Sequence, residues 1–326
     1  MRSIKSISAA TLALILITLP LAGWWKAEAI EDWFKLRNYN PPASIVNLAN
    51  QDTMTPQAVH DFYVNHPQLI QGVSTFRQDC PESEQAIVLG CYRPVQNGIF
   101  IYDVQDARLS GVQQVTAAHE MLHGAYDRLS DKEKNYVDGL LEDYYKNDLT
   151  DSRIKEEIKG YKTSEPGQEV NEMHSIFGTE IAVLPAPLET YYKRYFVNRS
   201  QVVGFAQDYQ KVFRTRQAAL NTDKIKIDEL HSTIIAEEQT LKNQLAQLNS
   251  DRARLDAEQA SGQTDRYNSE VPGFNAEVDA YNSGVYKLQS DIKEYNSLVQ
   301  DYNSLAGELR SLEQSIDTRL TPQAAQ

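Results

Sequence analysis

The chain has 326 residues, and its 45 acidic against 32 basic side chains give it a formal net charge of −13. This charge argues against binding of nucleic acid or anionic lipid headgroups through the protein surface, because both need basic patches. The sequence contains no Gly-rich phosphate-binding loop, so ATP-driven chemistry is not indicated.

Residues 1–29 are predicted to form a membrane segment. Basic residues precede an apolar run over residues 7–23, and the paired Trp24 and Trp25 that follow suit the headgroup boundary. A cleaved signal peptide is the alternative, because Ala27-Glu28-Ala29 offers a small-x-small site. We expect an uncleaved signal-anchor that holds the body of the protein outside the cytoplasm, in the cell envelope; cleavage would make the protein secreted.

Residues 30–200 have the mixed composition of one globular domain, and we expect an α+β fold in which helices dominate. Thr55-Pro56 predicts the start of a short helix, and residues 85–90 and 97–104 read as strands. Ser130-x-x-Glu133 predicts a capping box that opens an amphipathic helix.

The sequence has two cysteines, Cys80 and Cys91. In an oxidising compartment they could form one disulfide that closes a short loop and contributes about 3 kcal/mol. In a reducing compartment they would be two free thiols. Their spacing is not that of a zinc knuckle.

Residues 119–123 read His-Glu-Met-Leu-His and carry most of the functional information in the sequence. Two histidines four apart lie on one face of a helix, so both imidazoles can reach a single Zn²⁺ ion. The offset of Glu120 places its carboxylate beside the metal, where it can take a proton from an activated water. Ser110 is the expected N-cap of this helix. The plainer interpretation is a helix whose histidines are ordinary surface or core residues.

This segment resembles the zincin superfamily of zinc metallopeptidases. Zincin helices that supply a third histidine need Gly and His where this chain has Tyr126 and Leu129, so that branch is excluded. Downstream, Asn171-Glu172-x-x-Ser175 resembles the helix that carries the glutamate ligand in thermolysin-like enzymes, the gluzincins. The resemblance implies that Glu172 is the third zinc ligand.

The resemblance covers only the two ligand helices. The gap between His123 and Glu172 is longer than in thermolysin, and Ile176 stands where that family has an aspartate. His174 and Glu180 therefore remain rival ligands. The second helix is expected to have Pro166 near its first turn and Gly178 just past its last.

Other roles follow from the needs of such a site. Asp127 is a candidate to orient His123, because zinc-binding histidines usually donate their second N–H to a carboxylate or carbonyl. We expect His174 to act in catalysis as the donor to the oxyanion, and four tyrosines are further candidates: Tyr126, Tyr161, Tyr191 and Tyr192. In zincins an edge strand precedes the zinc helix and pairs with an extended substrate, which residues 97–104 would fit.

Residues 201–326 follow a seven-residue repeat that is typical of a coiled coil. One arm places apolar side chains at Phe213, Leu220, Ile227, Ile234, Leu241, Leu248 and Leu255. The second places them at Phe274, Tyr281, Leu288, Tyr295, Tyr302, Leu309 and Ile316, with Val271, Val278, Val285, Ile292, Val299 and Ala306 between. The best turn is Ser261-Gly262-Gln263, which predicts an antiparallel hairpin, although Pro272 could move it. Self-association or a protein partner is the alternative use of these arms.

Two functions are consistent with the sequence. The first is a membrane-anchored, extracytoplasmic zinc metallopeptidase that hydrolyses a peptide or protein substrate, with zinc on His119, His123 and Glu172 and with Glu120 as general base. The second is an envelope scaffold or adaptor that acts through its coiled coil and carries a structural or inactive zinc domain. Glu120 favours the enzyme, because a structural zinc site has no use for a general base there.

Overall fold

The computed structural model describes residues 27–81, 88–96, 98–164 and 166–319. The predicted membrane segment lies outside these residues except for its last three, 27–29, which belong to α2 (Ala27–Leu36). Within the described part of the chain, no helix is both long and apolar enough to cross a membrane. The chain divides into two compact units, one made of residues up to Gln210 together with those from Ser315, and the other of Lys211–Gln314.

The first unit is a helix-dominated α+β fold around a small sheet. Three short strands, β1 (Gln68–Ile70), β2 (Gly90–Arg93) and β3 (Gly98–Tyr102), are ordered β1-β3-β2 in the described part of the chain. β1 is parallel to β3, and β2 is antiparallel to it. The strand expected at 97–104 is confirmed over Gly98–Tyr102, but it is wrong to expect an edge strand there, because β3 is central and β2 lies at the edge.

The other strand prediction, residues 85–90, falls largely outside the described part of the chain, since residues 82–87 are not described. The strand that follows begins at Gly90. The predicted disulfide is confirmed: Cys80 and Cys91 are bonded with their Cα atoms 5.9 Å apart. This bond ties the end of α5 to the edge strand β2.

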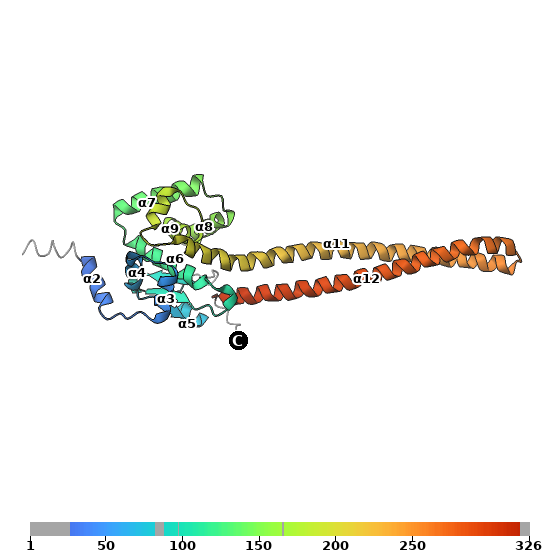
Figure 1. Cartoon of the computed structure of the whole chain (residues 1–326), viewed down its shortest axis with the longest axis horizontal. Coiled ribbons are helices and arrows are strands. Elements are labelled where there is room, and N and C mark those ends of the chain that lie inside the picture. The colour runs from blue at the N-terminus through green and yellow to red at the C-terminus, as the bar shows by residue number, and fades with distance from the viewer. Residues whose placement is uncertain (1–26, 82–87, 97, 165, 320–326) are drawn as a thin grey trace, which may run out of the picture. The chain divides into compact units, whose positions relative to one another are not determined.

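Helices make up most of the rest of this unit (Figure 1), and α3, α5 and α6 contact the sheet. They are α3 (Ala43–Gln51), α4 (Pro56–Tyr63), α5 (Val73–Asp79), α6 (Val112–Asp127), α7 (Asp131–Asn147), α8 (Ser152–Ser164), α9 (Glu169–Glu180) and α10 (Ala186–Tyr192). Two predicted starts are confirmed. The Thr55 hydroxyl accepts a hydrogen bond from the Ala58 N–H at the start of α4, and Ser130 and Glu133 form the capping box of α7.

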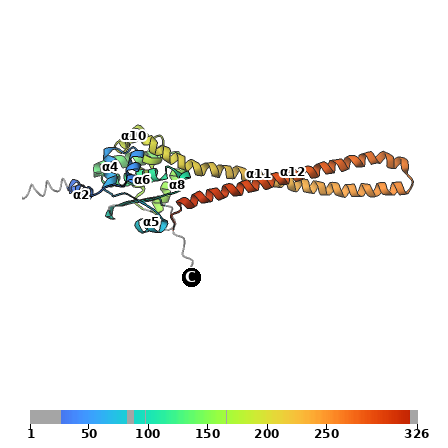
Figure 2. The same ribbon diagram turned by 60° about the horizontal axis from the view of Figure 1, so that its bottom comes forward.

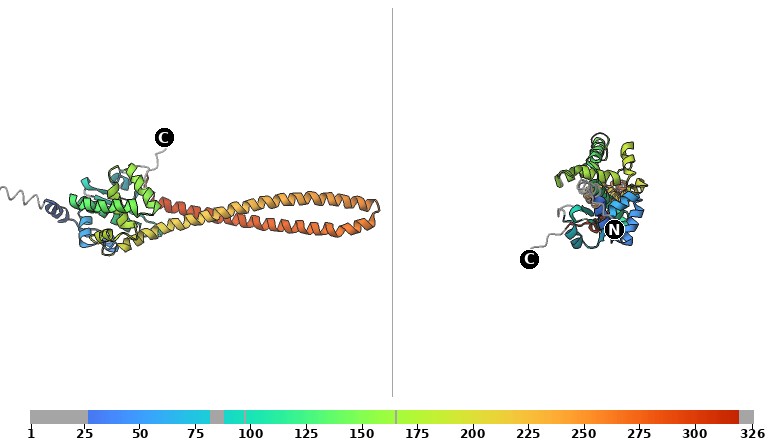
Figure 3. Two further views of the ribbon diagram at one scale, coloured as in Figure 1. Left: turned by 90° about the horizontal axis from the view of Figure 1, so that it is seen from above. Right: turned by 90° about the vertical axis from the view of Figure 1, so that its left-hand side faces the viewer.

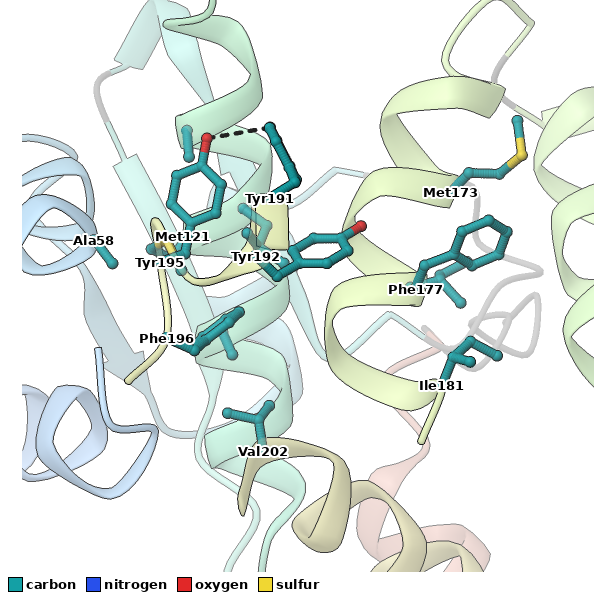
Figure 4. Close-up of a cluster of buried hydrophobic side chains, with 14 of the residues drawn as sticks. Ala58, Met121, Met173, Phe177, Ile181, Tyr191, Tyr192, Tyr195, Phe196 and Val202 are labelled. Atoms are coloured by element: carbon teal, nitrogen blue, oxygen red, sulfur yellow. Dashed lines mark hydrogen bonds between the residues drawn. The ribbon is translucent and has the colours of Figure 1, made fainter. Parts of the chain in front are cut away.

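The core of the first unit lies where α6, α9 and α10 meet. Met121 of α6, Phe177 of α9 and Tyr192 of α10 are fully or almost fully buried there, and Tyr195 and Phe196 close it from the loop that follows α10 (Figure 4). Large aromatic side chains bury much apolar surface each, so this cluster is a major source of the stability of the fold.

The second unit consists of most of two long antiparallel helices, whose outer ends belong to the first unit. α11 (Arg199–Ala260) and α12 (Thr264–Ile316) run side by side and are joined by a short turn at one end (Figures 1 and 2). The two arms also wind about each other in the left view of Figure 3. The turn lies at the predicted Ser261-Gly262-Gln263, and Pro272 stays within α12 without moving it.

On the first arm, the seven-residue pattern correctly predicts most of the side chains that are buried between the two helices. Leu220, Ile234, Leu241, Leu248 and Leu255 are buried as expected. On the second arm, Leu309 is buried at an expected position, but Ile292 is 37% exposed. Its predicted place in the seam is wrong, and its neighbour Asp291 is half-buried instead, because helices that wind around each other do not keep every repeat in register.

Asp52 is a buried acid in the first unit. It follows α3, has no exposed surface, and neither of its carboxylate oxygens has a hydrogen-bond partner among the described residues. Burial raises the pKa of Asp52 well above its usual value of 3.8, because the charged form cannot be solvated there.

We therefore expect Asp52 to make folding less favourable as the pH rises. Above pH 3.8 the unfolded chain releases this proton and the folded chain does not, so stability falls by up to about 1.4 kcal/mol per pH unit. Asp52→Asn removes this contribution. Chemical denaturation of both proteins between acidic and neutral pH should show the variant gaining stability relative to the wild type as pH rises. Parallel pH profiles would contradict this account.

Candidate metal centre

Helix α6 carries both histidines of the motif. It is buried along most of its length, with Val112, Val115, Met121 and Leu122 in contact with the surrounding core. The helix begins after Gly111, so the expected N-cap Ser110 is wrong; Ser110 ends a short 3-10 turn that precedes the helix. Because His119 and His123 are four residues apart, their rings lie on one face, with centroids 4.8 Å apart.

Helix α9 carries Glu172 and packs closely against α6. Gly178 makes this approach possible, because a Cβ atom there would lie 2.5 Å from the Leu122 side chain and 2.8 Å from the Tyr192 ring. The helix continues to Glu180, so the expected role of Gly178 as its stop is wrong, and Pro166 lies before its first turn. Gly178 thus allows close packing of two helices and does not end α9.

The two helices bring three ligand groups together. The Nε2 atoms of His119 and His123 lie 3.0 Å apart. The Glu172 oxygens lie 3.5 Å from Nε2 of His119 and 3.4 Å from Nε2 of His123. Ligands about 2.0–2.2 Å from a tetrahedral zinc ion lie about 3.3–3.6 Å from one another, so these separations are close to those of a zinc site.

The burial of this group fits a cation. Glu172 and His123 are 5% and 8% exposed, and Oε2 of Glu172 has no hydrogen-bond partner among the described residues. Its only polar contact among these groups is the longer ion pair with Nε2 of His119 at 3.5 Å, and a metal ion would coordinate this buried oxygen directly. The cluster of His119, His123 and Glu172 could therefore hold a metal ion. Two imidazoles and a carboxylate suit zinc and other first-row divalent ions.

The charges of the three side chains also favour a cation between them. Burial disfavours a charge on His119, but Glu172 and Glu120 outweigh it and raise the pKa of His119 to about 9. Burial lowers the pKa of His123. Burial disfavours the Glu172 carboxylate, yet both histidines hold its pKa below the usual value. The His119 imidazolium and the Glu172 carboxylate thus stabilise each other's charged forms, and a bound cation would have the same effect on Glu172.

Asn171 orients His123. Its Oδ1 atom lies 3.0 Å from Nδ1 of His123, which turns Nε2 of that ring toward the cluster. The expected partner Asp127 is wrong, because Asp127 lies near the Tyr92 hydroxyl of β2 and contributes, after burial, to raising the pKa of Tyr92. Asn171 stands directly before Glu172, so one helical turn supplies both a ligand and the orientation of another.

Glu120 lies at the wall of the same pocket. Its side chain is buried at 6% exposure and lines a pocket together with the three ligand residues and the edge strand β2. A Cβ atom at Gly90 of β2 would lie 2.7 Å from the Glu120 carboxylate. Any larger residue at position 90 would displace this carboxylate, so the strand and the glutamate fit together only with glycine there.

The structure does not bring His174 into this group. His174 is fully buried within the aromatic core, and its Nε2 atom pairs with the Tyr191 hydroxyl at 2.9 Å. Burial, followed by the neighbouring histidines, lowers the pKa of His174 to about 3. It therefore lies among packed aromatic rings as a neutral side chain and does not line the pocket, where a donor to the oxyanion would have to lie.

The remaining candidates are the rival ligand Glu180 and the four tyrosines. Glu180 lines the pocket, but its carboxylate pairs with Arg153 at 2.7 Å, away from the ligand cluster. Tyr191 and Tyr192 lie in the core, and the Tyr126 hydroxyl donates to Asp138. Tyr161 lines the pocket as expected, and two tyrosines that the sequence did not single out, Tyr92 and Tyr209, do so too.

Comparison with known proteins gives no relative. The chain matches no protein-family model, no curated protein and no solved structure. The interpretation of this pocket therefore depends on its own geometry.

Removing the carboxylate of Glu172 or that of Glu180 should show which of the two binds the metal. Loss of a residue that only orients a metal ligand weakens metal binding roughly 10–100-fold. In Zn²⁺ titrations followed by metal analysis, we expect Glu172→Ala, which removes a ligand itself, to weaken binding by about 100-fold or more. Glu180→Ala is the matched control and should bind like the wild type. Equal losses in both variants would contradict the proposed ligand set.

The contact between Asn171 and His123 predicts a smaller effect. Asn171→Ala leaves the ring of His123 free to turn, so Zn²⁺ affinity should fall about 10–100-fold. Asn171→Asp keeps an acceptor oxygen at the same place and should restore most of the affinity. If Asn171→Ala binds Zn²⁺ as tightly as the wild type, the ring of His123 is oriented by something else.

Proposed function

We propose that this protein is a membrane-anchored, extracytoplasmic zinc metallopeptidase of the zincin type. The observation that carries the proposal is the convergence of His119, His123 and Glu172 beside the buried carboxylate of Glu120 in one open pocket. Three protein ligands leave a coordination position for water or substrate, as in catalytic zinc sites.

A bound Zn²⁺ ion would supply a Lewis acid that acidifies water and polarises a carbonyl group. Glu120 would accept a proton from the attacking water as the water oxygen forms a bond to the peptide carbonyl carbon. It would pass that proton to the leaving nitrogen as the C–N bond breaks, so atoms and charges balance. Tyr92 and Tyr161 line the pocket and take the place of His174 as candidate donors to the oxyanion.

The edge strand β2 supports a peptide as the substrate. Its residues from Gly90 to Tyr92 line the pocket, and among the described residues β3 is the only strand that pairs with it. An extended peptide could add to the other side by backbone hydrogen bonds, which would place a peptide bond along the wall that Glu120 faces. The Cys80–Cys91 disulfide holds this strand in place.

Export is supported by two features. The apolar N-terminal run has the composition of a signal-anchor, and the Cys80–Cys91 disulfide is of a kind that persists in oxidising compartments. Both fit a body that lies outside the cytoplasm.

An envelope scaffold or adaptor is the second candidate. The hairpin favours this candidate. Its helices α11 and α12 have 62 and 53 residues, which is far longer than the helices needed to line a pocket. In that case the metal would be structural and Glu120 would have no chemical role. The two candidates differ in whether Glu120 affects turnover.

Glu120→Gln tests the enzyme directly. Loss of general base catalysis should lower cleavage of a peptide library by about 10²–10⁴-fold, while the bound Zn²⁺ remains because no ligand is removed. Glu156→Gln, an exposed change on α8, is the control and should leave cleavage intact. Cleavage that survives Glu120→Gln, or its absence in the zinc-loaded wild type, would favour the scaffold.

A further inference from the structure

Helix α2 presents its apolar face outward. Ile30, Trp33 and Phe34 follow the i, i+3, i+4 spacing of one helical face and are 49%, 59% and 54% exposed. A helix that lies on a soluble domain normally turns such a stripe toward the core. Here the stripe is on the outside of the first unit.

The polar face of α2 is fixed against the protein. Asp32 is 5% exposed, and its two carboxylate oxygens accept hydrogen bonds from the Arg128 guanidinium at 3.2 and 2.6 Å. Arg128 also pairs with Glu28 of α2 at 3.0 Å and with the buried Asp61 of α4 at 3.1 Å. Rolling α2 to bury its apolar face would break this network and leave buried charges unpaired. The outward face is therefore built into the fold.

The chemistry of this face suits the boundary of a bilayer. The Arg37 guanidinium lies over the rings of Trp33 and Phe34, 5.6 and 4.9 Å from their centroids. Aromatic rings with an adjacent cation on a short amphipathic helix are typical of segments that lie among lipid headgroups.

The position of α2 in the chain favours a lipid surface as the partner of this face. The apolar run of the expected anchor ends at Gly23, Trp24 and Trp25 follow it, and α2 begins at Ala27. If that run spans the bilayer, α2 starts at the headgroup boundary with too little chain between to move away. A lipid surface is then the nearest apolar phase.

We propose that Ile30, Trp33 and Phe34 of α2 lie in the interfacial region of the lipid bilayer, a second membrane contact besides the N-terminal run. This inference rests on the membrane anchoring in the proposed function and is independent of the metal. Arg128, which holds α2, directly follows α6. The contact would therefore hold the end of the metal-binding helix beside the membrane and present the pocket to substrates near its surface.

Tryptophan fluorescence of the full chain in phosphatidylcholine vesicles tests this contact. The chain has three tryptophans, and Trp24→Phe with Trp25→Phe leaves Trp33 as the only reporter while keeping the run apolar. Lipids brominated near the carbonyl end of their acyl chains should quench Trp33 about twofold, more than lipids brominated near the methyl end, because interfacial helices lie about 5–10 Å deep.

A matched control places the reporter elsewhere on the same unit. Tyr136 of α7 is also 59% exposed, so the chain with Tyr136→Trp and all three native tryptophans changed to Phe should show no quenching by either lipid. Iodide in the aqueous phase should quench this control and spare Trp33.

The outcomes separate the contact from the anchor. If the protein floats with the vesicles but Trp33 is not quenched by bromine, the inference is overturned while the anchor stands. Shielding of Trp33 from iodide without bromine quenching would mean that residues 1–26 or a second copy cover the face, which also overturns it. Failure to float overturns both the contact and the anchoring.

Discussion

The close packing of α9 on α6 is the constraint on which the candidate site depends. Glu172 and the two histidines are far apart in the chain, and only the approach of these helices at Gly178 brings their polar atoms to within 3.5 Å of one another. The aromatic core around Tyr192 and Phe177 holds the helices together from the other side. The pocket and the core are thus two faces of one helix pair.

The charges of the three side chains explain why this packing suits a cation. A buried carboxylate and two imidazole nitrogens aimed at one point are unfavourable without a positive charge between them, since the protein cannot solvate them. A proton on His119 can supply this charge, because the effect of burial is outweighed by Glu172 and Glu120, which raise the pKa of His119. A divalent ion would do so better, because it would also coordinate Oε2 of Glu172, which accepts no hydrogen bond from the described residues. Asn171 and Gly90 then fix the orientation of the His123 ring and the space available to Glu120.

Features set by neighbouring residues could be predicted from the sequence. The pairing of His119 with His123, the capping box at Ser130 and the hairpin turn depend on local spacing, and the structure has all three. Features set by tertiary packing could not. His174 carries no mark that it faces the core, and Gly178 has the same signature whether it ends a helix or permits a close approach. The pairing of Asn171 with His123 and the reversed face of α2 likewise arise only when distant segments meet.

We propose that one metal ion binds between α6 and α9. Anomalous diffraction at the zinc absorption edge, from crystals of the full-length protein grown with Zn²⁺, would locate it. We expect a single strong peak in bonding range of Nε2 of His119, Nε2 of His123 and a carboxylate oxygen of Glu172 (about 2.0–2.2 Å for zinc). A zinc-loaded crystal with no peak at that place, or with a peak held by other residues, would contradict it.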